Sequence, residues 1–132
     1  PSGWGLGNVS VRLRAGVRPP PRAGLDLYMA HQDQVVELPP GAVWLAEAPH
    51  CQHAMFALDG HVLGLQPHPE FTADFMREMT VDESFHVNPS LRASALDSYT
   101  RPVDSATVGL WAADLLGLGS PPAADEWTRW LR

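Results

Sequence analysis

The stretch that decides how this chain is interpreted runs Val62-Leu63-Gly64-Leu65-Gln66-Pro67-His68-Pro69-Glu70-Phe71. Its apolar start predicts a buried strand, which delivers a histidine and a carboxylate two residues apart. Because proline biases the preceding residue toward extended geometry, Gln66 and His68 are both expected to be extended. A histidine held at the mouth of a strand beside a carboxylate fits a general base and the group that orients it. The stretch contains no nucleophile.

Hydrophobic periodicity on either side of this stretch predicts strands first and helices later. The predicted strands cover residues 9–15, 25–31 and 42–46, with a loop at 17–24, a turn at 39–41, and a hairpin of 54–58 and 61–66 closed by Asp59-Gly60. The predicted helices cover 73–79 after a Thr72 cap, 90–98 after Asn88-Pro89, a third from Asp104 or Ser105 to Gly117, and a turn in the tail 123–132. This order fits half of an α/β domain.

Bulk properties limit the classes of function. The chain has 132 residues, the length of one domain, and a net charge of −6. Its nine Lys and Arg positions are all arginine. An acidic chain without a basic stripe argues against nucleic acid and anionic membrane as partners. The single cysteine, Cys51, excludes an internal disulfide and favours a reducing cytoplasm. The longest apolar stretch, 108–118, contains Asp114 and is too short to span a bilayer.

Several short runs in this chain resemble class I glutamine amidotransferases, the family that uses a Cys-His-Glu triad. His68-Pro69-Glu70 resembles the family's His-Pro-Glu signature. The upstream runs occur in the family's order and are Gly3-Trp4-Gly5, His31-Gln32-Asp33-Gln34-Val35, Leu38-Pro39-Pro40-Gly41, 45–48 and Ala54-Met55-Phe56. Together they cover residues 1 to about 80, and stand-alone amidotransferases of the GMP-synthase type look most similar.

The resemblance implies an α/β, flavodoxin-like fold with a mixed sheet flanked by helices. Residues 1–85 would be the C-terminal part of the amidotransferase domain, and residues 86–132 its helical C-terminal extension. The chain begins with Pro1 and reads like the interior of a longer protein, so we expect the first strands, the nucleophilic cysteine and the oxyanion donors to lie upstream.

The activity that the resemblance implies is hydrolysis of the glutamine side-chain amide through a cysteine thioester. His68 would act as the base and Glu70 as its orienter. The substrate would be glutamine or a γ-glutamyl compound, and an acceptor domain or subunit would receive the ammonia. No metal or organic cofactor is needed for this half-reaction.

Other interpretations compete with this one. His68 and Glu70 can be a turn histidine and a helix-start carboxylate, since acids favour helix N-termini, and the chain can be a degenerate, non-catalytic amidotransferase-like module that binds a partner or small molecule. The run His50-Cys51-Gln52-His53, with His61 nearby, invites a metal-site hypothesis, but its spacing is not that of a standard zinc site. Cys51 does not sit in a nucleophile elbow, and His31 and Asp33 suit a structural or site-rim role better than a catalytic one.

Overall fold

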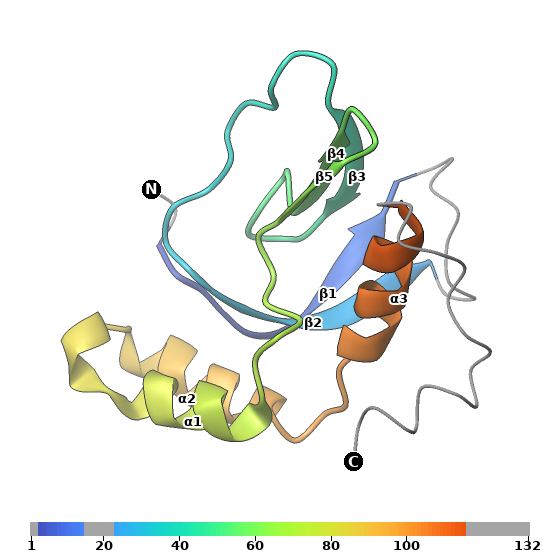
Figure 1. Cartoon of the computed structure of the whole chain (residues 1–132). Helices are drawn as coiled ribbons and strands as arrows, with labels where there is room; N and C mark the ends of the chain where they lie inside the picture. The colour runs from blue at the N-terminus through green and yellow to red at the C-terminus, as the bar shows by residue number, and fades with distance from the viewer. Residues whose placement is uncertain (1–2, 15–22, 116–132) are drawn as a thin grey trace.

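The computed structural model describes residues 3–14 and 23–115. Its strands form one sheet in the order β2-β1-β3-β4-β5, and every neighbouring pair is antiparallel. The sheet curls, so that β3, β4 and β5 rise away from β1 and β2 (Figure 1). The strands are β1 (Gly5–Leu13), β2 (Gly24–His31), β3 (Val43–Glu47), β4 (Met55–Leu58) and β5 (Val62–Leu65).

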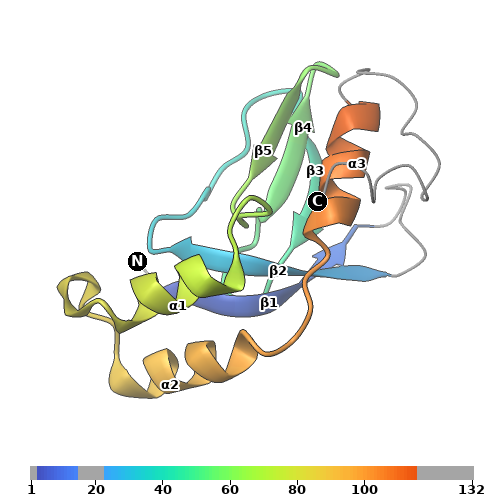
Figure 2. The ribbon, with the colours of Figure 1, turned by 60° about the horizontal axis from the view of Figure 1, so that its bottom comes forward.

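The helices cover both faces of the curled sheet. In Figure 2, α1 and α2 lie side by side beneath β1 and β2, whereas α3 stands at the other end of the molecule beside β3. The helices are α1 (Ala73–Val81), α2 (Pro89–Ser98) and α3 (Ser105–Leu115), with a 3₁₀ turn, η1 (Glu83–Phe85), between α1 and α2. No helix in the described ranges has the length and apolarity needed to cross a bilayer.

Successive side chains of a strand point to opposite faces of the sheet, and the apolar ones form one cluster on each face. In β2, Leu27 and Met29 face the cluster that Val108 of α3 completes, while Tyr28 between them faces α1 and α2. Burying apolar side chains on both faces is what holds helices against a sheet. The buried members of the first cluster are Val11, Leu25, Leu27, Met29, Leu45, Ala46, Cys51, Ala54, Met55, Ala57 and Val108, and those of the second are Leu6, Tyr28, Met76, Val87, Ala95 and Tyr99.

Local signals in the sequence locate most elements correctly. Strand β2 ends at His31, as predicted, and both Asp59 (φ 53°) and Gly60 (φ 69°) adopt the positive φ angles of the predicted tight hairpin turn. The Thr72 side chain accepts a hydrogen bond from the Phe75 N–H, and the Asn88 side chain accepts one from the Ser90 N–H, so both predicted helix caps are confirmed. The predicted end of β1 at Ala15, most of the 17–24 loop, the helix stop at Gly117 and the tail 123–132 lie outside the described residues.

The structure confirms the α/β class and changes two details. A mixed sheet was expected, but the described strands pair only in antiparallel fashion. Antiparallel strands can be joined by short connections, whereas a parallel pair needs a long crossover. Strand β5 was expected to be buried, but none of its residues is, and Val62 is 40% exposed. The reason is its place at the edge of the described sheet, where it has only β4 as a neighbour. The division between residues 1–85 and 86–132 stays a prediction.

Candidate active site

The connection from β5 to α1 holds the histidine and carboxylate of the Pro-His-Pro-Glu run together. The His68 backbone N–H donates to the Tyr28 carbonyl at 2.8 Å, which fastens this connection to β2. The His68 Nδ1 atom lies 2.8 Å from Glu70 Oε1. Because a carboxylate only accepts hydrogen bonds, neutral His68 donates from Nδ1 and leaves its Nε2 lone pair free. This is the arrangement that a general base and its orienter require.

The electrostatics of the pair keep the carboxylate ionised. Partial burial acts to raise the pKa of Glu70, but the hydrogen bond from His68, a backbone N–H and the His68 charge together hold the pKa below its ordinary value of 4.5. Glu70 also closely precedes α1, whose positive N-terminal end favours a negative charge. The His68 side chain is 31% exposed, so the imidazole is partly open to solvent.

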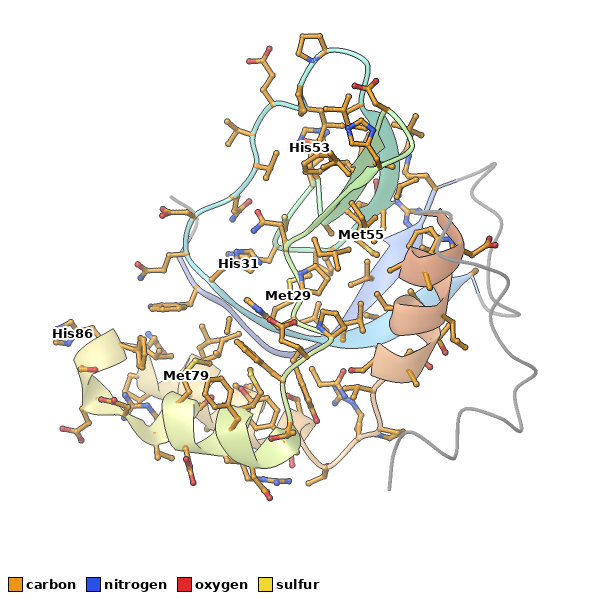
Figure 3. The ribbon with its side chains drawn as sticks, viewed as in Figure 1. Met29, His31, His53, Met55, Met79 and His86 are labelled. Carbon is orange, nitrogen blue, oxygen red and sulfur yellow. The ribbon has the colours of Figure 1, made fainter. Side chains whose placement is uncertain are left out.

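Two other histidines, His31 and His50, lie against each other. His31, at the end of β2, donates from Nδ1 to the Asp33 carbonyl at 3.0 Å, and its ring lies 5.6 Å from that of His50. His31 and Met29 both extend from β2, and the Met29 sulfur is 3.2 Å from His31 Nε2 (Figure 3). The Asp33 backbone, and not its carboxylate, makes this contact. The structural or site-rim role of His31 and Asp33 stays a prediction.

Gly5 is what allows the His31–His50 pair to lie against β1. A Cβ atom added to Gly5 would come within 2.5 Å of His50 Cδ2, which is closer than real Cβ atoms approach, and within 3.1 Å of His31 Nε2, which is a tight contact. The Gln34 side-chain amide holds His50 from the other side, with 3.1 Å between the two Nε2 atoms. A larger residue at position 5 would therefore displace at least one of the two imidazoles.

We expect the stability of the fold to decrease when the pH falls below 6.5 because of His31. Burial lowers the pKa of His31 from its usual value of 6.5, and the charges of His50 and His68 lower it further. The hydrogen bond to the Asp33 backbone acts in the opposite direction. Below pH 6.5 the unfolded chain then binds more protons than the folded one, so acid favours unfolding. Urea unfolding between about pH 7 and pH 5 should show a shallower pH dependence for His31→Gln than for the wild type. A wild-type slope in that variant, with His61→Gln as control, would show that His31 is not the titrating group.

The structure does not assemble the hypothetical metal cluster. His53 lies among β3, β4 and β5, with Nδ1 3.0 Å from the Val35 carbonyl, and it is well separated from His31 in Figure 3. His61 contacts the Asp59 carbonyl at the hairpin turn. Within residues 3–14 and 23–115, no group of three histidine, cysteine or acidic side chains is placed to hold a metal ion.

Cys51 is a core residue. Its side chain is fully buried, and burial raises the pKa of its thiol, against a smaller lowering by a hydrogen bond from the His53 backbone. A nucleophilic cysteine needs the opposite shift, toward the thiolate. The Cys51 sulfur contacts Gln66 Oε1 at 3.7 Å, and the same oxygen accepts the Val35 N–H at 2.9 Å. Gln66 thus joins the 32–42 segment to the end of β5, a role that its sequence position does not signal.

Comparison with known proteins finds relatives for part of the chain. No protein-family model matches the chain. Its sequence is 37% identical over 57 residues to γ-glutamyl peptidase 3 of Arabidopsis thaliana, covering 43% of this chain and 23% of that protein. It is 35% identical over 71 residues to the glutamine-hydrolysing GMP synthase of Aeromonas salmonicida, covering 51% of this chain and 14% of that enzyme. The chain therefore spans less than a quarter of the length of either relative.

The fold comparison points the same way. The structure superposes on a glutamine amidotransferase from Methylobacillus flagellatus with a TM-score of 0.59 and 23% identity, covering 85% of this chain and 50% of that one. The fold is thus that of part of a glutamine amidotransferase. The sequence relatives narrow the resemblance to class I proteins of two kinds, GMP synthases and γ-glutamyl peptidases, as the sequence motifs had indicated.

Proposed function

We propose that this chain supplies the base and its orienter for amide hydrolysis of the glutamine amidotransferase type. The observation that carries the proposal is the 2.8 Å hydrogen bond between His68 Nδ1 and Glu70 Oε1, which leaves Nε2 of the partly exposed imidazole directed away from the carboxylate. In the relatives, hydrolysis of glutamine and cleavage at a γ-glutamyl group act on the same carbonyl position. The substrate class proposed here is therefore glutamine or a γ-glutamyl compound.

In the proposed reaction, the nucleophile is a cysteine from outside these 132 residues. Its thiol proton moves to His68 Nε2, and the sulfur attacks the side-chain carbonyl carbon. The tetrahedral intermediate collapses as His68 returns the proton to the departing nitrogen, so that ammonia leaves and a thioester remains. His68 then takes a proton from water, hydroxide attacks the thioester, and the thiol is restored as glutamate leaves. Glu70 stabilises the imidazolium in both halves of the reaction.

The same proposal extends to the ammonia acceptor, the cofactor requirement and the cellular compartment. An acceptor domain or subunit takes the ammonia, as the coupling of glutamine hydrolysis to synthesis in a GMP synthase requires. Neither step needs a metal or organic cofactor. A single buried cysteine suits a reducing compartment, so we place the reaction in the cytoplasm.

The 132-residue chain alone is expected to release no ammonia from glutamine. A base without a positioned nucleophile cannot form the acyl intermediate, and Cys51 is buried with a thiol that stays protonated. A coupled ammonia assay on the purified chain checks this, with Cys51→Ala as the matched control. Ammonia release that disappears in Cys51→Ala would contradict both the proposal and the core assignment of Cys51.

A non-catalytic binding module is the alternative, and the coding sequence distinguishes the two. A G-x-C-x-G elbow encoded ahead of Pro1 supports the enzyme, because that turn exposes a nucleophile at the end of a strand. Translation that starts near Pro1 leaves His68 without a nucleophile in its own chain and favours the binding module.

A further inference from the structure

We propose that Phe71 is a positioning residue for His68, and this inference rests on the function proposed above. The two rings stack face to face, with centroids 4.2 Å apart and an angle of 5° between their planes. The Glu70 hydrogen bond fixes one edge of the imidazole, at Nδ1. The Phe71 ring fixes the plane in which that edge lies, so together they determine where Nε2 points.

Glu70 alone is a weak restraint on the imidazole. Its side chain is 62% exposed, so water competes for the carboxylate and the side chain keeps rotational freedom. A hydrogen bond at one ring atom also leaves the imidazole free to tilt about that bond. A parallel aromatic surface removes this freedom, because tilting the imidazole would break contact across the whole ring face.

Phe71 is itself packed against other side chains. Its ring is half-buried against the cluster that Met76 and Tyr28 complete. The Phe75 ring, itself 46% exposed, packs on it with the centroids 4.5 Å apart and an angle of 52°, and Phe75 belongs to the first turn of α1. The Phe71 N–H donates to the His68 carbonyl at 3.3 Å, which closes the turn that brings the two rings together. The restraint on the base therefore extends through Phe71 to the helix.

This arrangement also restricts access to the base. Phe71 covers one face of the imidazole, so a thiol can reach Nε2 only in the ring plane or from the opposite face. The plane is the productive direction, since the nitrogen lone pair lies in it. General-base catalysis depends on such alignment, and small misplacements cost large factors in rate.

The test measures the His68 tautomer directly, by ¹⁵N chemical shifts of the two ring nitrogens in the 132-residue chain at a pH where His68 is neutral. The wild type is expected to carry its proton on Nδ1 alone. Phe71→Leu, which keeps an apolar side chain but removes the ring, is expected to show a mixture of Nδ1–H and Nε2–H forms and to lose the ring-current shifts of His68. Phe71→Tyr restores the ring and should restore the wild-type tautomer.

The control is Phe85→Leu, the same substitution at a ring that contacts Trp4 instead of His68. The titratable neighbours of His68, namely Glu70 and His31 with His50 beside it, are the same in all these variants. A single wild-type tautomer in Phe71→Leu would overturn the proposal. So would an equal mixture in Phe85→Leu, because it would indicate general loosening of the fold.

A kinetic measurement separates this inference from the proposed function. In the protein that includes the nucleophilic cysteine, Phe71→Leu is expected to lower kcat for glutamine roughly 10- to 100-fold, with little change in KM. A tautomer mixture with unchanged kcat would support the positioning role and contradict the catalytic one. Loss of kcat with an unchanged tautomer would contradict the positioning role.

Discussion

Replacing His68 with alanine is expected to lower kcat for glutamine hydrolysis by about 10³-fold or more, in the protein that joins this segment to its nucleophilic cysteine. The variant loses the acceptor for the thiol proton and the donor for the leaving ammonia. Binding of glutamine and the oxyanion donors remain, so KM should change much less than kcat. Steady-state kinetics with an ammonia-coupled assay measures both parameters.

Glu70→Gln is expected to reduce the rate less than His68→Ala does. The amide oxygen of the substituted side chain can still accept from His68 Nδ1, but the imidazolium loses the negative charge that stabilises it. Because these residues act as a unit, the double variant should be little worse than His68→Ala alone. Since Glu70 is mostly exposed, its replacement should leave the unfolding transition unchanged.

His61→Ala is the matched control for the His68 substitution. Its ring contacts the Asp59 carbonyl at the exposed hairpin turn, away from His68, so it should retain wild-type kinetics. Near wild-type kcat in both His68→Ala and Glu70→Gln would refute the triad assignment. The non-catalytic module would then be the better account of the chain.

Features that depend on neighbours in sequence could be predicted. Asp59-Gly60 specifies a tight turn because both residues tolerate positive φ, and Thr72 and Asn88 cap helices because their side chains reach N–H groups two or three residues later. The approach of Glu70 to His68 belongs to the same class, since the two residues lie two positions apart in the sequence with a proline between them. The sequence alone was sufficient for these features.

Features that depend on the curl of the sheet could not be predicted. His50 reaches His31 because a tight turn links Ala48 and Cys51, and Gly5 leaves room for both rings. Nothing in the spacing of residues 5, 31 and 50 encodes that meeting. The stacking of Phe71 on His68 is local in sequence. It also depends on the course of α1, because the ring of Phe75, in that helix, packs on Phe71.

The burial of residues along strand β1 could also be predicted only in part from the sequence. Its alternation predicts a wet face that carries Ser10 and Arg12, and both are exposed. Asn8, two residues earlier on the same face, is only 4% exposed because α2 covers this end of the strand. The sequence pattern marks the polar face but cannot tell where along the strand a distant helix begins to cover it.

Asn8→Ala is therefore expected to destabilise the fold by about 1–3 kcal/mol. The Asn8 side-chain amide donates to the Arg101 and Pro102 carbonyls, both at 3.1 Å, and so joins β1 to the segment between α2 and α3. Each lost hydrogen bond removes about 0.5–1.5 kcal/mol, and partly buried carbonyls left without a donor add to the loss. Urea unfolding measures the change in free energy.

Two comparisons make the Asn8 result decisive. Ser94→Ala changes an exposed residue of α2 and should stay within about 0.5 kcal/mol of the wild type. Asn8→Asp keeps the size of the side chain but turns the donor into an acceptor that faces two carbonyls, so it should destabilise at least as much as alanine. If Asn8→Ala matched Ser94→Ala, the two carbonyls would be satisfied by water. The strand–helix junction would then depend on apolar packing and on the Asn8 backbone, whose N–H donates to Ser98 Oγ and whose carbonyl accepts from Arg101.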